Sequence, residues 1–130
     1  MDVSLRQRMP TIERHIAAPS EVVWRLLVDL DAWPQWGPSL QRAELSQAGP
    51  LQLGSRGKVW TPFGLALPFE ITEFDEGRSW AWRVAGIGAT RHGVDPDGDG
   101  SRAWMSAPVW ATAYLPVCAI ALQRIGRMAG

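Results

Sequence analysis

The spacing of apolar segments in the second half of the chain constrains the fold most strongly. Short runs rich in Val, Ile, Phe and Trp alternate with turn residues about every ten positions. Residues such as Asp75-Glu76-Gly77 join such runs tightly, so neighbouring strands should be antiparallel. This pattern predicts an antiparallel meander with strands over 56–62, 67–74, 79–84, 90–94 and 102–106.

After residue 109 the apolar residues recur at every third or fourth position. Leu115, Cys118, Leu122 and Ile125 share this helical spacing. The pattern predicts a long C-terminal helix over 109–129, kinked near Pro116. A helix with one apolar face must bury that face, and the concave side of a curved sheet is where it can do so.

The first 45 residues add two strands and two short helices. Strands are expected over 11–17 and 40–45. Pro19-Ser20-Glu21 opens a helix, which Pro34 breaks into two short pieces. The expected fold is therefore α+β: a curved antiparallel sheet of six to seven strands wrapped on a long C-terminal helix, with two short helices after the first strand. Residues 1–10 are expected to be a flexible N-terminus, and 11–130 a single domain.

Composition excludes several classes of function. Lys plus Arg and Asp plus Glu number 13 each, so the net charge is zero and there is no basic footprint for nucleic acid. The single cysteine, Cys118, lies among apolar neighbours, as is typical of a buried and unreactive thiol. The apolar run 111–122 is too short for a membrane span, and no signal-peptide core is visible. We expect a cytoplasmic monomer or homodimer.

Residues 16–29, IAAPSEVVWRLLVD, followed by WPQW at 33–36, resemble the opening of the START-like (SRPBCC) superfamily. This superfamily includes the polyketide cyclase/dehydrase and lipid-transport family. FEITEFD at 69–75 and WAWRVAG at 80–86 follow in the order that the family shows. The resemblance covers about residues 11–129 and implies a helix-grip fold with a hydrophobic cavity between the sheet and the terminal helix. It does not imply catalysis.

Trp80 and Trp82 lie two positions apart and so share one face of the sheet. They could line the cavity or fill it. Trp33 and Trp36 could border its entrance, although we favour a role in anchoring the short helix to the sheet. The residues expected at the cavity wall are Trp36, Phe69, Ile71, Trp80, Trp82, Met105, Cys118 and Leu122, together with the polar candidates His92, Tyr114 and Arg14.

His92 and Tyr114 are the only candidates for catalysis in this set. Without a visible partner carboxylate, we expect His92 to be a hydrogen-bonded structural residue. Arg14 shares a face with Ile12 and Ile16, so it would need a partner or an anionic ligand group. Four other side chains are expected to face solvent, the last three as cross-strand partners: His15, Glu70, Arg83 and Arg91.

Asp95, Asp97, Asp99 and Gly100 mimic the first half of a calcium-binding loop. The twelfth position of that loop would be Ser106, where calcium requires a bidentate glutamate. The segment is therefore expected to be a hairpin turn, and no metal or cofactor is expected.

Three functions remain open from the sequence. The first is a non-catalytic carrier or sensor of a hydrophobic small molecule, such as a lipid or polyketide. The second is a polyketide cyclase, aromatase or dehydratase, which would need His92 and Tyr114 to point into the cavity. The third is an interaction module, which a cavity filled by side chains would favour.

Overall fold

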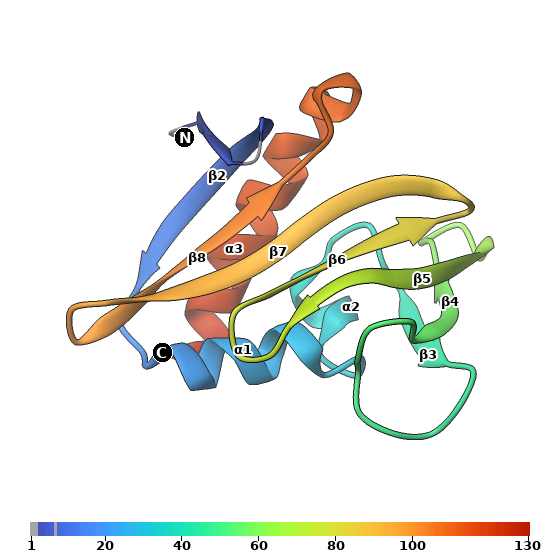
Figure 1. Ribbon diagram of the computed structural model, residues 1–130, viewed down its shortest axis with the longest axis horizontal. Helices are drawn as coiled ribbons and strands as arrows, with labels where there is room; N and C mark the ends of the chain where they lie inside the picture. The colour runs from blue at the N-terminus through green and yellow to red at the C-terminus, as the bar shows by residue number, and fades with distance from the viewer. Residues whose placement is uncertain (1–2, 7) are drawn as a thin grey trace.

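The computed structural model describes residues 3–6 and 8–130. Within these ranges the chain forms one antiparallel sheet with the strand order β1-β2-β8-β7-β6-β5-β4-β3. Figure 1 shows the curved sheet wrapping around α3, with α1 near the C-terminal end of α3 and α2 to one side of it. The strands are β1 (Val3–Arg6), β2 (Met9–Ile16), β3 (Arg42–Leu45), β4 (Arg56–Trp60), β5 (Ala66–Asp75), β6 (Ser79–Val84), β7 (Ile87–Asp97) and β8 (Gly100–Ser106). The helices are α1 (Ser20–Val28), α2 (Trp33–Trp36), the 3-10 helix η1 (Val109–Tyr114) and α3 (Leu115–Ala129).

The α+β architecture predicted from the sequence is confirmed, but the described residues form eight strands where six to seven were expected. The additional strand is β1, which lies in the segment expected to be a flexible N-terminus. It pairs antiparallel with β2, from Val3 opposite Ile12 to Arg6 opposite Met9. Val3 and Leu5 are exposed, so β1 is an edge strand held by backbone pairing. Such a strand leaves no burial pattern in the sequence.

The expected C-terminal helix consists of two segments. Ala111 departs from helical geometry (φ −112°, ψ 27°) within η1, and α3 begins at Leu115. Pro116 lies in the first turn of α3, where its missing N–H has no helical partner to lose. By length and composition, 109–129 is the one helical stretch in the described chain that could also cross a membrane. Here α3 buries Leu115, Cys118, Ala121, Leu122 and Ile125 against the rest of the core.

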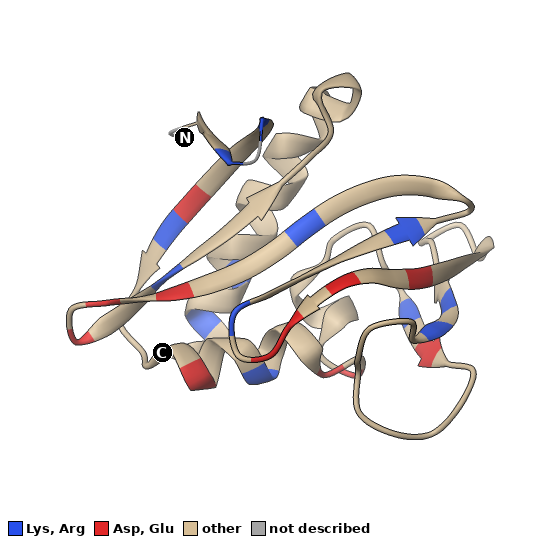
Figure 2. Ribbon diagram, in the orientation of Figure 1, with Lys and Arg blue, Asp and Glu red and all other residues tan. Residues whose placement is uncertain are grey.

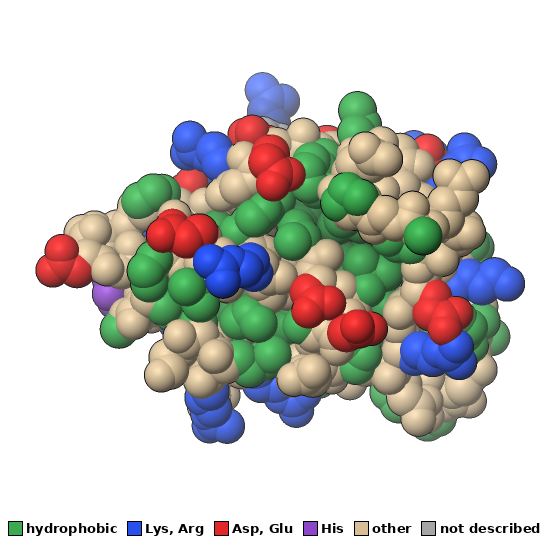
Figure 3. All heavy atoms as spheres, turned by 90° about the horizontal axis from the view of Figure 1, so that it is seen from below, with side chains coloured by type: hydrophobic (Ala, Val, Ile, Leu, Met, Phe, Trp, Pro, Cys, Tyr) green, Lys and Arg blue, Asp and Glu red, His purple; other side chains and the backbone are tan. Residues whose placement is uncertain are grey.

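The convex face of the sheet carries most of the ion pairs. Glu70 lies 3.7 Å from both Arg56 and Arg83, which makes it the cross-strand partner that the alternation predicted. In Figure 3, which shows the side of the molecule below the view of Figure 1, acidic and basic side chains are scattered among hydrophobic ones. The side shown in Figure 3 has no continuous basic stripe.

Arg91 was expected to face solvent, but it is buried. It is only 7% exposed, although it lies on the convex face. Its guanidinium pairs with Glu73 at 3.3 Å and lies 5.6 Å from the centre of the Trp104 ring. Trp104 in turn is buried and covers Gly93 on the neighbouring strand. Alternation along a strand predicts which face a residue occupies, but not whether an aromatic neighbour covers it there.

The contact between Gly93 and Trp104 yields a prediction for stability. A Cβ atom at position 93 would lie 2.3 Å from the Trp104 ring and 2.8 Å from the Arg78 carbonyl oxygen. We expect Gly93→Ala to lower the free energy of unfolding by about 1–3 kcal/mol, measured by urea denaturation. Gly88→Ala on the same strand is the matched control, because a Cβ there meets nothing within 4 Å. Equal denaturation midpoints for the two variants would contradict this account.

Candidate ligand-binding site

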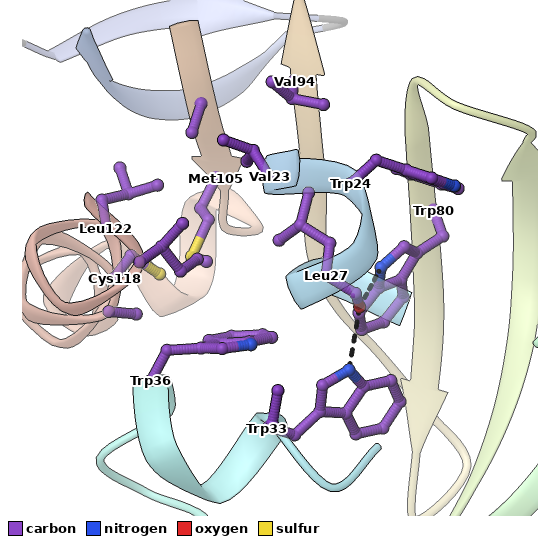
Figure 4. Packing of buried hydrophobic residues seen from close by; sticks show 14 of the residues in the cluster. Val23, Trp24, Leu27, Trp33, Trp36, Trp80, Val94, Met105, Cys118 and Leu122 are labelled. Carbon is purple, nitrogen blue, oxygen red and sulfur yellow. Dashed lines mark hydrogen bonds between the residues drawn. The ribbon is translucent and has the colours of Figure 1, made fainter. Parts of the chain in front are cut away.

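Three tryptophan side chains close the C-terminal end of α1. The Leu27 carbonyl oxygen accepts hydrogen bonds from the indole N–H of Trp33 (2.8 Å) and of Trp80 (3.0 Å). The Leu26 carbonyl accepts one from Trp36 (2.8 Å). The last carbonyls of a helix have no partner within it, so the indoles satisfy groups that burial would otherwise leave unpaired. Figure 4 shows Trp33 and Trp80 converging on Leu27. Trp33 and Trp36 thus anchor α2 to α1.

Trp33 and Trp80 pack together with Trp82 beneath the sheet. Trp33 and Trp80 are stacked, with ring centres 5.0 Å apart, and Trp82 meets Trp80 edge-on at 5.3 Å. Trp33, Trp80 and Trp82 are all buried. An inner cavity of about 40 Å³ remains beside them. The tryptophans therefore both fill the core and form the wall of what is left open.

The inner cavity brings together most of the residues predicted for the site. Its wall includes the predicted residues Trp36, Trp80, Trp82, His92, Met105, Tyr114 and Cys118. In Figure 4 the Trp36 ring lies between α2 and the side chains of Met105 and Cys118. Sequence reasoning missed the connection from α2 to β3, residues 37–40, which closes the cavity on one side. The glycine, proline and serine of this connection indicate a turn, but their types do not indicate a binding site.

A larger outer pocket of about 300 Å³ adjoins the inner cavity. It lies between the strands β4 to β7, the connection from α2 to β3, and η1. Its wall is formed by Ser39, Leu40, Val59, Thr61, Leu67, Trp82, Val84, Ala89, Thr90, Pro108, Trp110, Ala111 and Tyr114. The two spaces share Ser39, Leu40, Trp82, Thr90 and Tyr114. A second space of about 300 Å³, within loop residues 45–56, is polar and contains none of the predicted site residues.

Four predicted residues lie outside both spaces. Phe69, Ile71 and Leu122 are buried in the packed core. Arg14 is exposed, and its guanidinium lies beside Gly126 near the end of α3. It does face the helix, as its alternation with Ile12 predicted, but at the end of the sheet where the side chain reaches solvent.

His92 is held in a short hydrogen-bonded chain. The Trp82 indole donates to the Thr90 hydroxyl at 3.0 Å, and this hydroxyl lies 2.9 Å from Nε2 of His92. Because the Thr90 oxygen already accepts the indole proton, its own proton is available to Nε2 of a neutral imidazole. The His92 ring also stacks on Trp80 at 4.0 Å. Burial lowers the pKa of His92 to about 3; the Trp80 backbone partly opposes this, and the nearby Arg91 charge adds to it. His92 is therefore neutral at pH 7.

This burial makes stability depend on pH. The unfolded chain protonates His92 near the ordinary pKa of 6.5, whereas the folded protein does so only near 3. Between these values the unfolded state binds more protons, so stability is lost as the pH falls. The His92 contribution should cost about 2 kcal/mol between pH 7 and pH 5, as measured by urea denaturation at both values. His92→Asn should remove this part of the pH dependence, whereas His15→Asn, at an exposed position, should retain it. The same pH dependence in both variants would contradict the assignment.

The other two titratable groups at the inner cavity are also held in their neutral forms. Partial burial raises the pKa of Tyr114, which is 37% exposed, while its hydroxyl forms a hydrogen bond with that of Ser39. Burial raises the pKa of Cys118 to about 12, so its thiol stays protonated, as its apolar surroundings indicated. Neither group is an activated nucleophile.

Two of the three aspartates of the calcium-like motif, Asp95 and Asp97, are ion-paired in the β7–β8 hairpin. Asp95 contacts Arg6 at 3.1 Å and Arg78 at 3.2 Å. Asp97 accepts hydrogen bonds from His15 and Arg102, and the bond to exposed His15 is the main reason why the pKa of Asp97 is lowered. In the described part of the chain, no three His, Cys, Asp or Glu residues form a metal-binding group.

Comparisons with known proteins agree with this architecture. A family model described as polyketide cyclase/dehydrase and lipid transport matches residues 10–121. Protein Ms6760 from Mycobacterium smegmatis is 19% identical, with 98% of this chain and 96% of that chain covered and a TM-score of 0.65. Protein MLL2253 from Mesorhizobium loti is 15% identical, with 91% and 93% covered and a TM-score of 0.72.

The Aha1 dimer from Colwellia psychrerythraea is 18% identical, with 92% of this chain and 93% of that chain covered and a TM-score of 0.68. Likeness at these identities shows the fold alone. No curated protein matches the sequence. The family match nevertheless spans most of the strands, α1, α2 and the first half of α3. The chain therefore belongs to the polyketide cyclase/dehydrase and lipid transport family of the START-like superfamily.

Proposed function

We propose that this protein binds a hydrophobic small molecule of lipid or polyketide type, as a non-catalytic carrier or sensor. The outer pocket carries the proposal: it measures about 300 Å³, its wall is mainly apolar, and it adjoins the inner cavity through shared residues. Concave, mostly apolar spaces of this size with a few polar groups are typical ligand sites. A filled cavity would favour an interaction module, and the outer pocket counts against that reading.

The state of the polar groups favours a carrier over an enzyme. A general acid or base works best when its pKa lies near the working pH. Burial moves the pKa of His92 down to about 3 and that of Tyr114 upward, so both move away from neutrality. The hydrogen bonds to Thr90 and Ser39 give both side chains an evident structural role.

Native mass spectrometry of the protein purified from the cells that naturally make it tests the proposal. We expect a co-purified apolar molecule, whose mass identifies the ligand class. Its removal by organic extraction should restore the mass of the bare chain. A protein that is consistently empty, and that also fails to bind apolar fluorescent probes, would overturn the proposal.

One observation supports the enzyme as a second candidate. His92 and Tyr114 line the same inner cavity, which is the condition that a cyclase, aromatase or dehydratase would need. That alternative predicts that His92→Ala abolishes turnover of a polyketide-type substrate while the ligand affinity stays nearly intact. The carrier predicts no such separation between turnover and affinity.

Under either function we propose a cytoplasmic protein, acting as a monomer or homodimer.

A further inference from the structure

Apolar and uncharged polar side chains line both spaces. Among the described residues that line them, there is no Asp, Glu, Lys or Arg. The sequence from Ala103 to Gln123, which includes η1 and most of α3, contains no Asp, Glu, Lys or Arg. In Figure 2, η1 has the tan colour of uncharged residues. Lys58 and Arg83 belong to strands that line the outer pocket. They alternate with the lining residues Val59 and Trp82 and so lie on the opposite face.

The described residues that line the two spaces provide no opposite charge that could pair with a charged group of a ligand. Transfer of an unpaired carboxylate or ammonium group from water into an apolar site is very unfavourable. Arg14 was the one candidate from the sequence that could have paired with an anionic ligand, and it lies at the end of α3 instead. The site is therefore matched to an uncharged molecule.

A polar contact is nevertheless available where the two spaces meet. Ser39 and Tyr114 line both spaces, and their hydroxyl groups are hydrogen-bonded to each other. Two hydroxyls hold two O–H donors, and the bond between them uses one. Within residues 3–6 and 8–130 neither oxygen has a second hydrogen-bond partner. The remaining donor can therefore bind an oxygen of a ligand.

We infer that the site selects an uncharged ligand with a hydrogen-bond-accepting oxygen, and that the Ser39–Tyr114 hydroxyl pair binds this oxygen. The inference rests on the proposed function and names the ligand class within it. A ketone, ester, ether or alcohol on an apolar skeleton meets both requirements. A free fatty acid or another carboxylate does not.

Two fluorescent probes with one skeleton test the charge selection. Phenylnaphthylamine is neutral, and anilinonaphthalene sulfonate is nearly the same molecule with an added anionic group. We expect titrations to show the sulfonate binding at least about tenfold more weakly. Equal affinities would overturn the inference and leave the proposed function standing. Lack of saturable binding of either probe, in a protein that is also empty when purified from its own cells, would overturn the proposed function and the inference with it.

A charge placed in the wall provides a second test. Ala111 lines the outer pocket, whereas Ala113 of the same helix is exposed and does not line it. Ala111→Arg should raise the affinity for the sulfonate probe about tenfold, because it supplies the missing partner charge. Ala113→Arg is the matched control for non-specific attraction. An equal gain in both variants would contradict binding of the sulfonate in this pocket.

The role of the hydroxyl pair is tested with prodan, a neutral naphthalene ketone. Tyr114→Phe keeps the ring and removes the hydroxyl. We expect this variant to lower the affinity for prodan about fivefold relative to phenylnaphthylamine, which has no oxygen. An unchanged ratio of the two affinities would overturn the assignment of the hydroxyl pair.

Discussion

Replacement of Trp33 with alanine is expected to lower the free energy of unfolding by about 3–5 kcal/mol, the range for truncation of a buried large aromatic residue. Trp33 has no exposed surface, and its ring stacks on Trp80 and contacts Phe69. Its loss would leave a cavity between α2 and the sheet. Urea denaturation followed by circular dichroism measures the effect.

Two variants separate the causes of this loss. Trp33→Phe keeps much of the packing but removes the N–H that donates to Leu27, whose carbonyl still accepts from Trp80. It should cost less than the alanine variant, about 1–3 kcal/mol. Trp110→Ala is the control for a tryptophan that is 72% exposed, and it should change stability by less than about 0.5 kcal/mol. Similar losses for Trp33→Ala and Trp110→Ala would contradict the described packing.

Ala111→Trp is expected to reduce the affinity for phenylnaphthylamine by at least about tenfold. Position 111 lines the outer pocket from η1, so the added indole occupies space that the probe needs. The measurement is a fluorescence titration of the purified variant. Its denaturation midpoint should stay near that of the parent chain, because position 111 is only partly buried.

Ala113→Trp is the matched control for this experiment. It adds the same side chain to the same 3-10 helix, but at an exposed position outside the pocket. Its affinity for the probe should match that of the parent chain. If both variants lost affinity equally, or if neither did, the outer pocket would not be the binding site.

The fold could be predicted from the sequence because its helices and strands have clear hydrophobic periodicity and are separated by turn residues. The strand 79–84 was predicted with the bounds that the structure shows, and Pro34 correctly indicated the break between α1 and α2. The edge strand β1 was missed because backbone pairing holds it, without a buried face. The helix expected from 109 begins at 115, because apolar spacing does not distinguish a 3-10 turn from an α-helix.

The candidate site could be predicted only in part. Trp80, Trp82 and His92 were placed on the inner face by alternation along their strands, and they line the inner cavity. The outer pocket was missed because part of its wall is formed by small residues such as Ser39 and Ala89, whose types do not indicate a binding site. Arg14 illustrates a different limit. The face of a strand residue can be predicted from its parity, but its distance from the cavity depends on how the sheet curves.

The boundary between η1 and α3 also separates two levels of local stability. None of the six residues of η1 is buried, whereas α3 buries an apolar face in the core. Displacement of η1 would therefore expose little apolar surface, and displacement of α3 would open the core. The outer wall of the pocket thus has a lower free energy of local unfolding than the helix beside it. A ligand could exchange with solvent through a local opening of η1, on a timescale much shorter than that of global unfolding.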